Sequence, residues 1–161
     1  MGNFADIEHA DLRQAIANRA YSKGGIAIDA TPADVETTAA VAYSINGVMY
    51  SLAIQAAIDV STLGVLTEKG AVTAMTAQAN NTDRIYLLVL NTSAAIKVIQ
   101  GAAVAAGALC YCPGVPPNHC AFAAVKVANT SGSAFTFGTT SLATAGVTET
   151  FFDLTMAPAT L

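Results

Sequence analysis

Charged side chains are scarce in this sequence. Asp, Glu, Lys and Arg make up 11% of the 161 residues, whereas an ordinary soluble domain contains about 25%. The formal net charge is −4, and the seven Lys and Arg residues form no basic cluster. Because binding to a phosphate backbone depends on such clusters, we expect no nucleic acid among the partners of this protein.

The sequence also lacks a long apolar stretch that could form an uninterrupted helix, although hydrophobic residues make up 53% of it. Residues 37–58 and 98–125 contain no Asp, Glu, Lys or Arg and are long enough to cross about 30 Å of hydrocarbon. Asn46-Gly47 interrupts the first stretch, and Pro113 and Pro116-Pro117 interrupt the second. Backbone in lipid must stay helical or close into a barrel, so we expect no membrane association. No basic segment precedes an apolar one at the N-terminus, so no export signal is expected.

Only three cysteines occur, Cys110, Cys112 and Cys120. An odd number without an export signal does not indicate a disulfide framework, so we expect reduced thiols. A disulfide from Cys110 or Cys112 to Cys120 is the alternative. Zinc binding with His119 is disfavoured because C-x-C followed by adjacent His and Cys departs from the usual ligand spacing. We therefore expect no metal site, and the role of the cysteines is left open.

A catalytic constellation is missing as well. The two histidines are His9, on a charged segment, and His119, whose adjacency to a cysteine is not the geometry of a catalytic pair. Asp and Glu residues are too sparse to indicate an obvious carboxylate pair, although Asp59, Glu149 and Asp153 could in principle meet, and no glycine-rich phosphate loop is present. We expect neither enzymatic activity nor a cofactor.

The scarcity of charge has two explanations. Proteins in assemblies cover much of their exterior with other protein, and such contacts are depleted in charge at their centres. Alternatively, a β-domain rich in Thr, Ser and Asn solvates itself with neutral polar groups. We favour the first explanation.

The charges that are present gather near the N-terminus. Nine of the 18 charged residues lie in the first 36 positions. The spacing of Leu12 and Ile16 predicts an amphipathic helix over residues 6–21 with a narrow apolar face, followed by an extended connector over 26–36. This shift in composition predicts two regions, an N-terminal arm (1–36) and a β-domain (37–161).

A β-hairpin is the clearest local prediction. Asn-Gly at 46–47 joins two alternating apolar runs, and a type I′ turn requires positive φ at both positions. Tyr43 and Tyr50 lie three residues before and after the turn, so they are expected to meet as a cross-strand pair.

Further short strands follow at regular intervals. A turn at 68–70 is expected to join strands in 63–67 and 71–75, and strands are also expected over 84–91, 95–100, 121–128 and 151–155. We expect a loop over residues 112–119 and a short helix or a loop over 101–109. Phe135 and Phe137 are expected to point together into the core. This pattern predicts a mainly β fold, a small antiparallel sandwich or open barrel with an N-terminal helix or extended arm.

Two stretches resemble small virion proteins of tailed bacteriophages. "YSINGVMYS" (43–51) is similar to a "Y-x-I-N-G-x-x-Y" hairpin early in those proteins. "VKVANTSGSAFTFGTTSLATAGVTETFFDLT" (125–155) is similar to their C-terminal segment, and "RIYLLVLNTSAAIKVIQG" (84–101) to a central hairpin. The cysteine-containing loop is not part of that pattern.

The resemblance implies a structural protein that decorates and cements the capsid exterior by bridging capsomers. The implied partners are the major capsid protein and further copies of this chain, as a homodimer or homotrimer, on a virion assembled from protein made in the host cytoplasm. The residues expected to contact the capsid or a neighbouring subunit are Phe4, Ile7, Leu12, Ile16, Tyr43 and Tyr50. The alternative function is a receptor- or carbohydrate-binding module of a phage head or tail fibre that uses Tyr43, Tyr50, Phe135 or Phe137.

Overall fold

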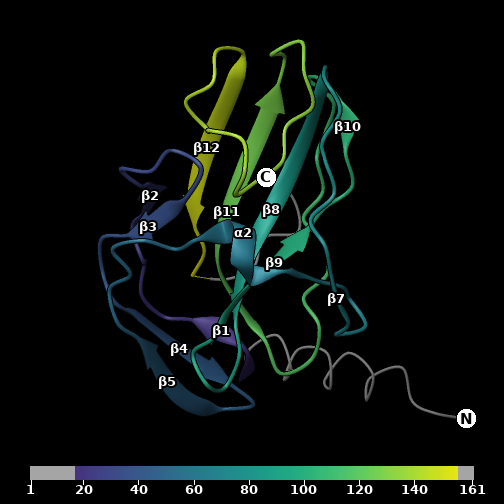
Figure 1. Cartoon of the computed structure of the whole chain (residues 1–161). Coiled ribbons are helices and arrows are strands. Elements are labelled where there is room, and N and C mark those ends of the chain that lie inside the picture. The colour runs from purple at the N-terminus through teal and green to yellow at the C-terminus, as the bar shows by residue number, and fades with distance from the viewer. Residues whose placement is uncertain (1–16, 156–161) are drawn as a thin grey trace, which may run out of the picture.

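The computed structural model describes residues 17–155, which form strands joined mainly by turns and loops (Figure 1). In chain order the elements are β1 (Arg19–Ala20), β2 (Ile26–Ile28), β3 (Val35–Thr37), β4 (Val41–Ile45), β5 (Val48–Leu52), α2 (Val60–Leu63), β6 (Val65–Leu66), β7 (Val72–Thr73), β8 (Thr82–Leu90), β9 (Ile96–Gln100), β10 (Val104–Ala105), β11 (Cys120–Asn129) and β12 (Val147–Asp153). Among the described residues, no helix is both long and apolar enough to span a bilayer.

A seven-stranded sheet forms the centre of the molecule. Its order is β12-β11-β8-β9-β6-β7, and β10 pairs with the beginning of β8. All neighbours pair antiparallel except β6 and β9, which run parallel at Val65 and Val98. The sheet ends at β12 and β7, so it is open at both edges.

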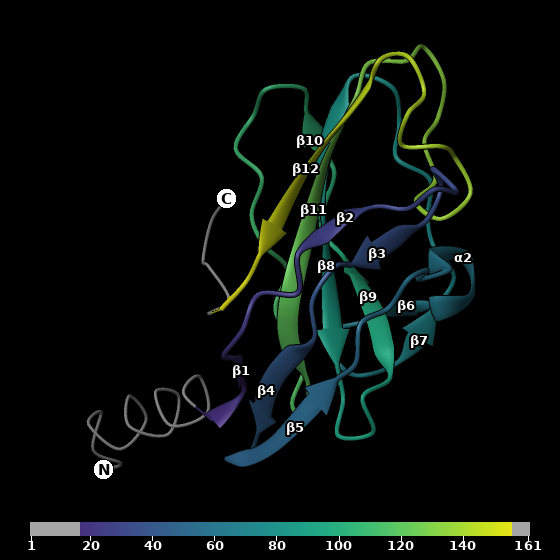
Figure 2. The ribbon, with the colours of Figure 1, turned by 90° about the vertical axis from the view of Figure 1, so that its left-hand side faces the viewer.

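Two smaller sheets cover one face of this large sheet. They are β1-β4-β5 and the hairpin β2-β3, which lie in front of β11, β8 and β9 in Figure 2. The main hydrophobic core lies between the layers, and its largest fully buried aromatic side chains are Tyr43, Tyr86, Phe122, Phe135 and Phe137. The stacking of sheets over one core makes the fold a small β-sandwich.

The opposite face of the large sheet holds a second, smaller core. Val104, Cys112 and Val115, from the segment between β9 and β11, pack against it. The central strand β8 therefore has both faces covered. Tyr86, Leu88 and Leu90 point into the main core, while Ile85, Leu87 and Val89 point into the smaller one, which explains the unbroken apolar run of this strand.

A β-bulge shifts the register of β11 against β8 between Ala121 and Ala123. As a result, two successive residues, Phe122 and Ala123, both belong to the main core, whereas Ala121 and Ala124 belong to the smaller one. The extra residue lets the large Phe122 ring enter the main core without exposing the rest of the strand.

The mainly β fold and its sandwich architecture are confirmed, and the open edges mean that the sheets do not close into a barrel. The Asn46-Gly47 hairpin is formed by β4 and β5, with φ of 52° and 78° at the two turn residues. The hairpin around 68–70 and the antiparallel pairing of β8 with β9 are also confirmed. So is the 112–119 loop.

The expected helix over 6–21 is wrong at its C-terminal end. Arg19 and Ala20 form β1, paired antiparallel with Ser44 and Tyr43 of β4, because Ala20 gains a place in the main core there. The rest of the expected helix, up to residue 16, lies outside the described residues. The connector expected over 26–36 is also more ordered than the sequence suggested, since β2 and β3 pair as an antiparallel hairpin.

Two further boundaries differ from expectation. Residues 101–109 form no helix but contain β10 and a turn, because Val104 packs against the smaller core as it pairs with Asp83. The last strand begins at Val147 rather than 151, because pairing with β11 extends to Asn129.

Residues 17–36 are continuous with the sandwich. Ala20, Ile26 and Val35 are buried in the same core as the residues that follow them. The described part of the chain is therefore not divided at the predicted boundary between residues 36 and 37.

Candidate interaction surface

The hairpin β4–β5 contains no charged residue, and hydrogen bonds fix the position of its turn. The Asn46 backbone N–H donates to Asn18 Oδ1 at 2.6 Å, and its side-chain Nδ2 donates to Asn118 Oδ1 at 2.7 Å. The Gly47 N–H donates to the Ala17 carbonyl at 3.2 Å. The turn is thus tied both to the segment that leads into β1 and to the loop before β11.

Tyr43 and Tyr50 stand directly opposite each other in the hairpin. Their rings stack with centroids 5.6 Å apart and an interplanar angle of 25°. The Tyr43 hydroxyl donates to the Asn91 carbonyl at 2.9 Å, which satisfies this polar group inside the core. The predicted cross-strand pair is therefore confirmed.

The expectation that Tyr43 contacts the capsid or another subunit is wrong. Its side chain is 0% exposed, because β1, β4 and the large sheet enclose it in the main core. Tyr50 lies at the core's margin and is half-buried, so its outer part remains accessible. The other four residues expected at this interface, Phe4, Ile7, Leu12 and Ile16, lie outside the described residues.

The sequence analysis did not identify the apolar side chains that do face outward here. Val48, Met49 and Ile54 are 55%, 58% and 58% exposed, and they lie on β5 and directly after it. No charged residue occurs between Glu36 and Asp59 in the sequence. That uncharged stretch indicated an apolar surface, but the sequence did not show which of its residues point away from the core.

β5 is also an edge strand, at the end of the order β1-β4-β5. The residues that flank a two-residue turn, Ile45 and Val48, exchange backbone hydrogen bonds, and pairs with this property alternate along a hairpin. The N–H and C=O groups of Met49 and Ser51 therefore point away from β4, toward a side where no strand among residues 17–155 pairs with β5. We call the outward side of residues 48–52 the β5 edge.

Both ends of the large sheet carry charge at or beside the edge strand. β12 contains Glu149 and Asp153, and the turn between β6 and β7 contains Glu68 and Lys69. Natural sheets protect exposed edges with charges, prolines or bulges, which discourage pairing with another chain. The β5 edge has none of these, so its surroundings favour association with another strand.

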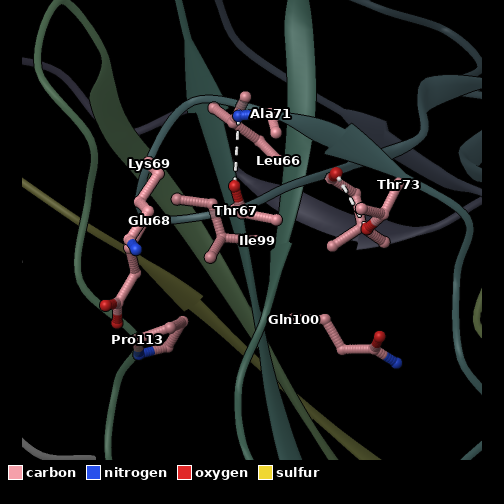
Figure 3. A pocket seen from close by; sticks show the side chains of 10 residues that line it. Leu66, Thr67, Glu68, Lys69, Ala71, Thr73, Ile99, Gln100 and Pro113 are labelled. Atoms are coloured by element: carbon pink, nitrogen blue, oxygen red, sulfur yellow. Dashed lines mark hydrogen bonds between the residues drawn. The ribbon is translucent and has the colours of Figure 1, made fainter.

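A shallow groove of about 590 Å³ lies beside the β6–β7 hairpin, between this hairpin, β9 and Pro113 (Figure 3). Most of its polar side chains are hydrogen-bonded within the fold. Thr67 Oγ1 accepts from the Ala71 N–H, and Glu68 Oε1 accepts from the Gly114 N–H. Gln100 is hydrogen-bonded to Thr76. The groove therefore offers few free polar groups to orient a small molecule.

The three cysteines are free thiols, and Cys120 lies apart from Cys110 and Cys112. Cys120 belongs to the main core and Cys110 to the smaller core, on opposite faces of the large sheet. That separation is incompatible with a disulfide or a shared metal ion between these two thiols. Among residues 17–155, no group of three or more His, Cys, Asp or Glu side chains is arranged to hold a metal.

Burial dominates the electrostatics of these thiols. It raises the pKa of Cys120 to about 12. It also raises the pKa of Cys110 and Cys112 above the ordinary cysteine value. A thiolate is the reactive form of cysteine, so the environment disfavours nucleophilic chemistry at these positions.

Two of the three carboxylates considered above, Asp59 and Asp153, have structural partners. Asp59 caps α2 by accepting from the Ser61 N–H at 3.0 Å. Asp153 Oδ1 accepts from the Gly25 and Ile26 N–H groups at 2.7 and 3.3 Å. Glu149 is four residues from Asp153 along β12, too far for the two carboxylates to share a proton or a metal.

The aromatic residues suggested for carbohydrate binding are mostly inaccessible. Phe135 and Phe137 are buried, as the core-facing reading predicted, and both rings contact Tyr86. With Tyr43 also buried, three of the four aromatic residues suggested for a sugar-binding surface are in the core. Tyr50 is the one that remains accessible.

Comparisons of this chain with protein-family models, curated proteins and solved structures find no match.

Proposed function

We propose that this protein is a structural component of a tailed-phage virion that binds the capsid exterior and bridges neighbouring capsomers. Its partners would be the major capsid protein and other copies of itself. The proposal starts from the sequence resemblance of residues 43–51 and 125–155 to small phage virion proteins. The observation that carries it is the β5 edge, an exposed apolar strand without charges on a protein that is poor in charge.

The architecture suits a load-bearing role. A cementing protein resists outward pressure from packaged DNA only if it transmits force between its contacts without deforming. Here the large sheet is packed on both faces, and the hairpin that bears the β5 edge is hydrogen-bonded at its turn to Asn18 and Asn118. Close packing of this kind gives low compressibility.

The point where residues 1–16 join the described chain supports a second contact. Residues 1–16 carry four of the 18 charges, and they join the described chain at Ala17, whose carbonyl accepts from Ser44 Oγ at 2.9 Å and from the Gly47 N–H. The junction at Ala17 therefore lies at the turn end of the β4–β5 hairpin. In the proposed function it is the charged arm that extends over the capsid, while the sandwich supplies the neutral contacts.

Capsid binding is the direct test. Empty capsids of the major capsid protein encoded in the same genome would be mixed with the purified full chain and separated by sedimentation. We expect saturable binding at a fixed number of copies per capsomer and a higher temperature of capsid disruption. Absence of co-sedimentation, with the added chain shown to be folded, would contradict the proposal.

A variant without residues 1–16 separates the arm from the sandwich. We expect it to fold and to bind capsids more weakly than the full chain. Undiminished occupancy would remove the arm from the proposal.

A glycan-binding measurement distinguishes the alternative function. The full chain would be applied to an array of bacterial surface glycans, with the Tyr50→Ala variant as the matched control. We expect no saturable binding. Binding that disappears in Tyr50→Ala would favour a receptor- or carbohydrate-binding module over a cementing protein.

A further inference from the structure

We propose that the β5 edge is a dimerisation surface, on which β5 pairs antiparallel with β5 of a second copy of this chain about a two-fold axis at Tyr50. The three-stranded β1-β4-β5 sheets of the two copies would then form one six-stranded sheet. This inference goes beyond the capsid role and does not depend on it.

The first argument is hydrogen bonding. The outward backbone groups of β5 belong to Met49 and Ser51. With the axis at Tyr50, Met49 of one copy stands opposite Ser51 of the other, and each such pair exchanges two N–H···O=C bonds. The two symmetric pairs together satisfy every outward-facing group of both strands.

The second argument is the fit of the side chains. In this register Tyr50 faces Tyr50 of the second copy in a non-hydrogen-bonded pair, where side chains approach most closely. The stack that Tyr43 and Tyr50 form within one chain would continue across the axis to four rings. Val48, which is largely exposed in the single chain, would lie against Leu52, and the long Met49 side chain against the small Ser51.

The third argument concerns charge, and it indicates that the strand that pairs with the β5 edge belongs to a second copy of this chain. A symmetric contact places each residue near its own equivalent, so a charged edge would repel itself. The stretch 37–58 carries no charge, whereas the edges at β12 and at the β6–β7 hairpin carry Glu149, Asp153, Glu68 and Lys69. Of these edges, the β5 edge is therefore the one suited to pairing with itself. Because no ions take part, the association should change little between low and high salt.

Sedimentation of the full chain over a range of concentrations tests the surface. We expect the wild type to be a dimer. Met49→Lys places a charge on the edge, and Ser51→Pro removes an outward N–H that plays no part in pairing with β4. Each variant should weaken dimerisation roughly 100-fold while keeping the wild-type circular dichroism spectrum.

Val72→Lys is the matched control. Val72 is 58% exposed, as Met49 is, but it lies on β7 at the edge of the other sheet. This variant should remain dimeric. A monomeric wild type, a trimer, or a dimer that survives both β5 substitutions would overturn the proposal.

A cysteine scan tests the register. Under oxidised glutathione, Tyr50→Cys should form a covalent dimer on a non-reducing gel, because the two new thiols face each other across the axis. Val48→Cys should crosslink far less, since its opposite residue is Leu52. Preferential crosslinking of Val48→Cys would overturn the axis at Tyr50. A dimer that fails to bind capsids would contradict the proposed function only, and a monomer that binds them would contradict this inference only.

Discussion

Cys120 shows how burial controls the chemistry of a single residue. The side chain is enclosed in the main core beside the β11 bulge, in surroundings that solvate a thiolate poorly. Its pKa of about 12 follows from that loss of solvation. The thiol therefore behaves as a small apolar group, which accounts for a cysteine in a core strand without any redox partner.

The same shift makes stability depend on pH. In the unfolded chain Cys120 ionises from its ordinary value of 9.0, whereas in the folded chain it stays protonated until about 12. Its contribution is complete below pH 9 and is lost as pH rises through 12. The free energy of unfolding should therefore fall by up to about 1.4 kcal/mol per pH unit from this group. Tyr43 and Tyr86, whose pKa values burial also raises, add to the decline.

Urea unfolding at several pH values between 8 and 11 measures this effect, with Cys120→Ala as the comparison. The variant should lose stability less steeply than the wild type over the alkaline range, whatever its stability at pH 8. Parallel curves for the two proteins would mean that the Cys120 thiol titrates normally in the fold.

At the scale of single elements, two turns have a glycine at positive φ but differ in what an added Cβ would contact. Gly47 in the β4–β5 turn has φ of 78°, and a Cβ there would meet nothing within 4 Å. Gly138 has φ of 82°, but a Cβ there would lie 2.5 Å from the Ser61 backbone nitrogen at the start of α2. Gly138 thus lets the loop after Phe137 pack directly on the helix.

Substitution by alanine should lower the free energy of unfolding by different amounts at Gly47 and Gly138. Gly47→Ala should destabilise the protein by about 1–2 kcal/mol, which is the cost of the left-handed conformation alone. Gly138→Ala should cost at least about 3 kcal/mol, because the contact with α2 must also open. Chemical denaturation of both variants measures the difference, and equal losses would show that the 138 loop moves away from α2 freely.

Element-level predictions from the sequence succeeded where the determinants are local. The β4–β5 hairpin follows from the turn chemistry of Asn46-Gly47, and β8 from the apolar run at 85–90. β1 and the β2–β3 hairpin were missed because their stability comes from distant partners. Arg19 and Ala20 become a strand only because β4 is beside them.

The candidate surface was predictable only in part, for a related reason. The sequence shows that 37–58 is uncharged, but Tyr43 and Tyr50 are equivalent in it. Which tyrosine is enclosed depends on β1 and the large sheet closing over β4, while β5 stays at the edge. Val48 and Met49 are exposed for the same reason, because β5 is an edge strand, and no local sequence pattern indicates this.

For the whole molecule, the important fact is that the first described residues belong to the core. Deleting residues 1–36 would remove β1, β2 and most of β3, including Ala20, Ile26 and Val35. Burying a side chain such as Ile26 or Val35 contributes about 1.5–3 kcal/mol, and a domain of this size has only about 5–15 kcal/mol in total. We expect this variant to lose its cooperative thermal transition. Deleting residues 1–16 leaves the described core complete and should preserve the transition.

Circular dichroism during heating distinguishes the two deletions. A cooperative transition near the wild-type midpoint for the 1–36 deletion would mean that the sandwich forms without β1–β3, as the charge distribution alone suggested. The comparison therefore decides between a boundary near residue 17 and one at residue 36.

The two hydrogen bonds from Gly25 and Ile26 to Asp153 have a consequence for synthesis on the ribosome. They join the start of β2 to the end of β12. The central strand β8 likewise has its neighbour β11 some 30 residues downstream. At translation rates of about 5–20 residues per second, β8 waits for seconds before β11 and β12 emerge to complete the sandwich. During that interval β8 can pair with β9 and β10 but not with β11, which leaves apolar side chains of β8 accessible to chaperones that bind extended apolar sequences.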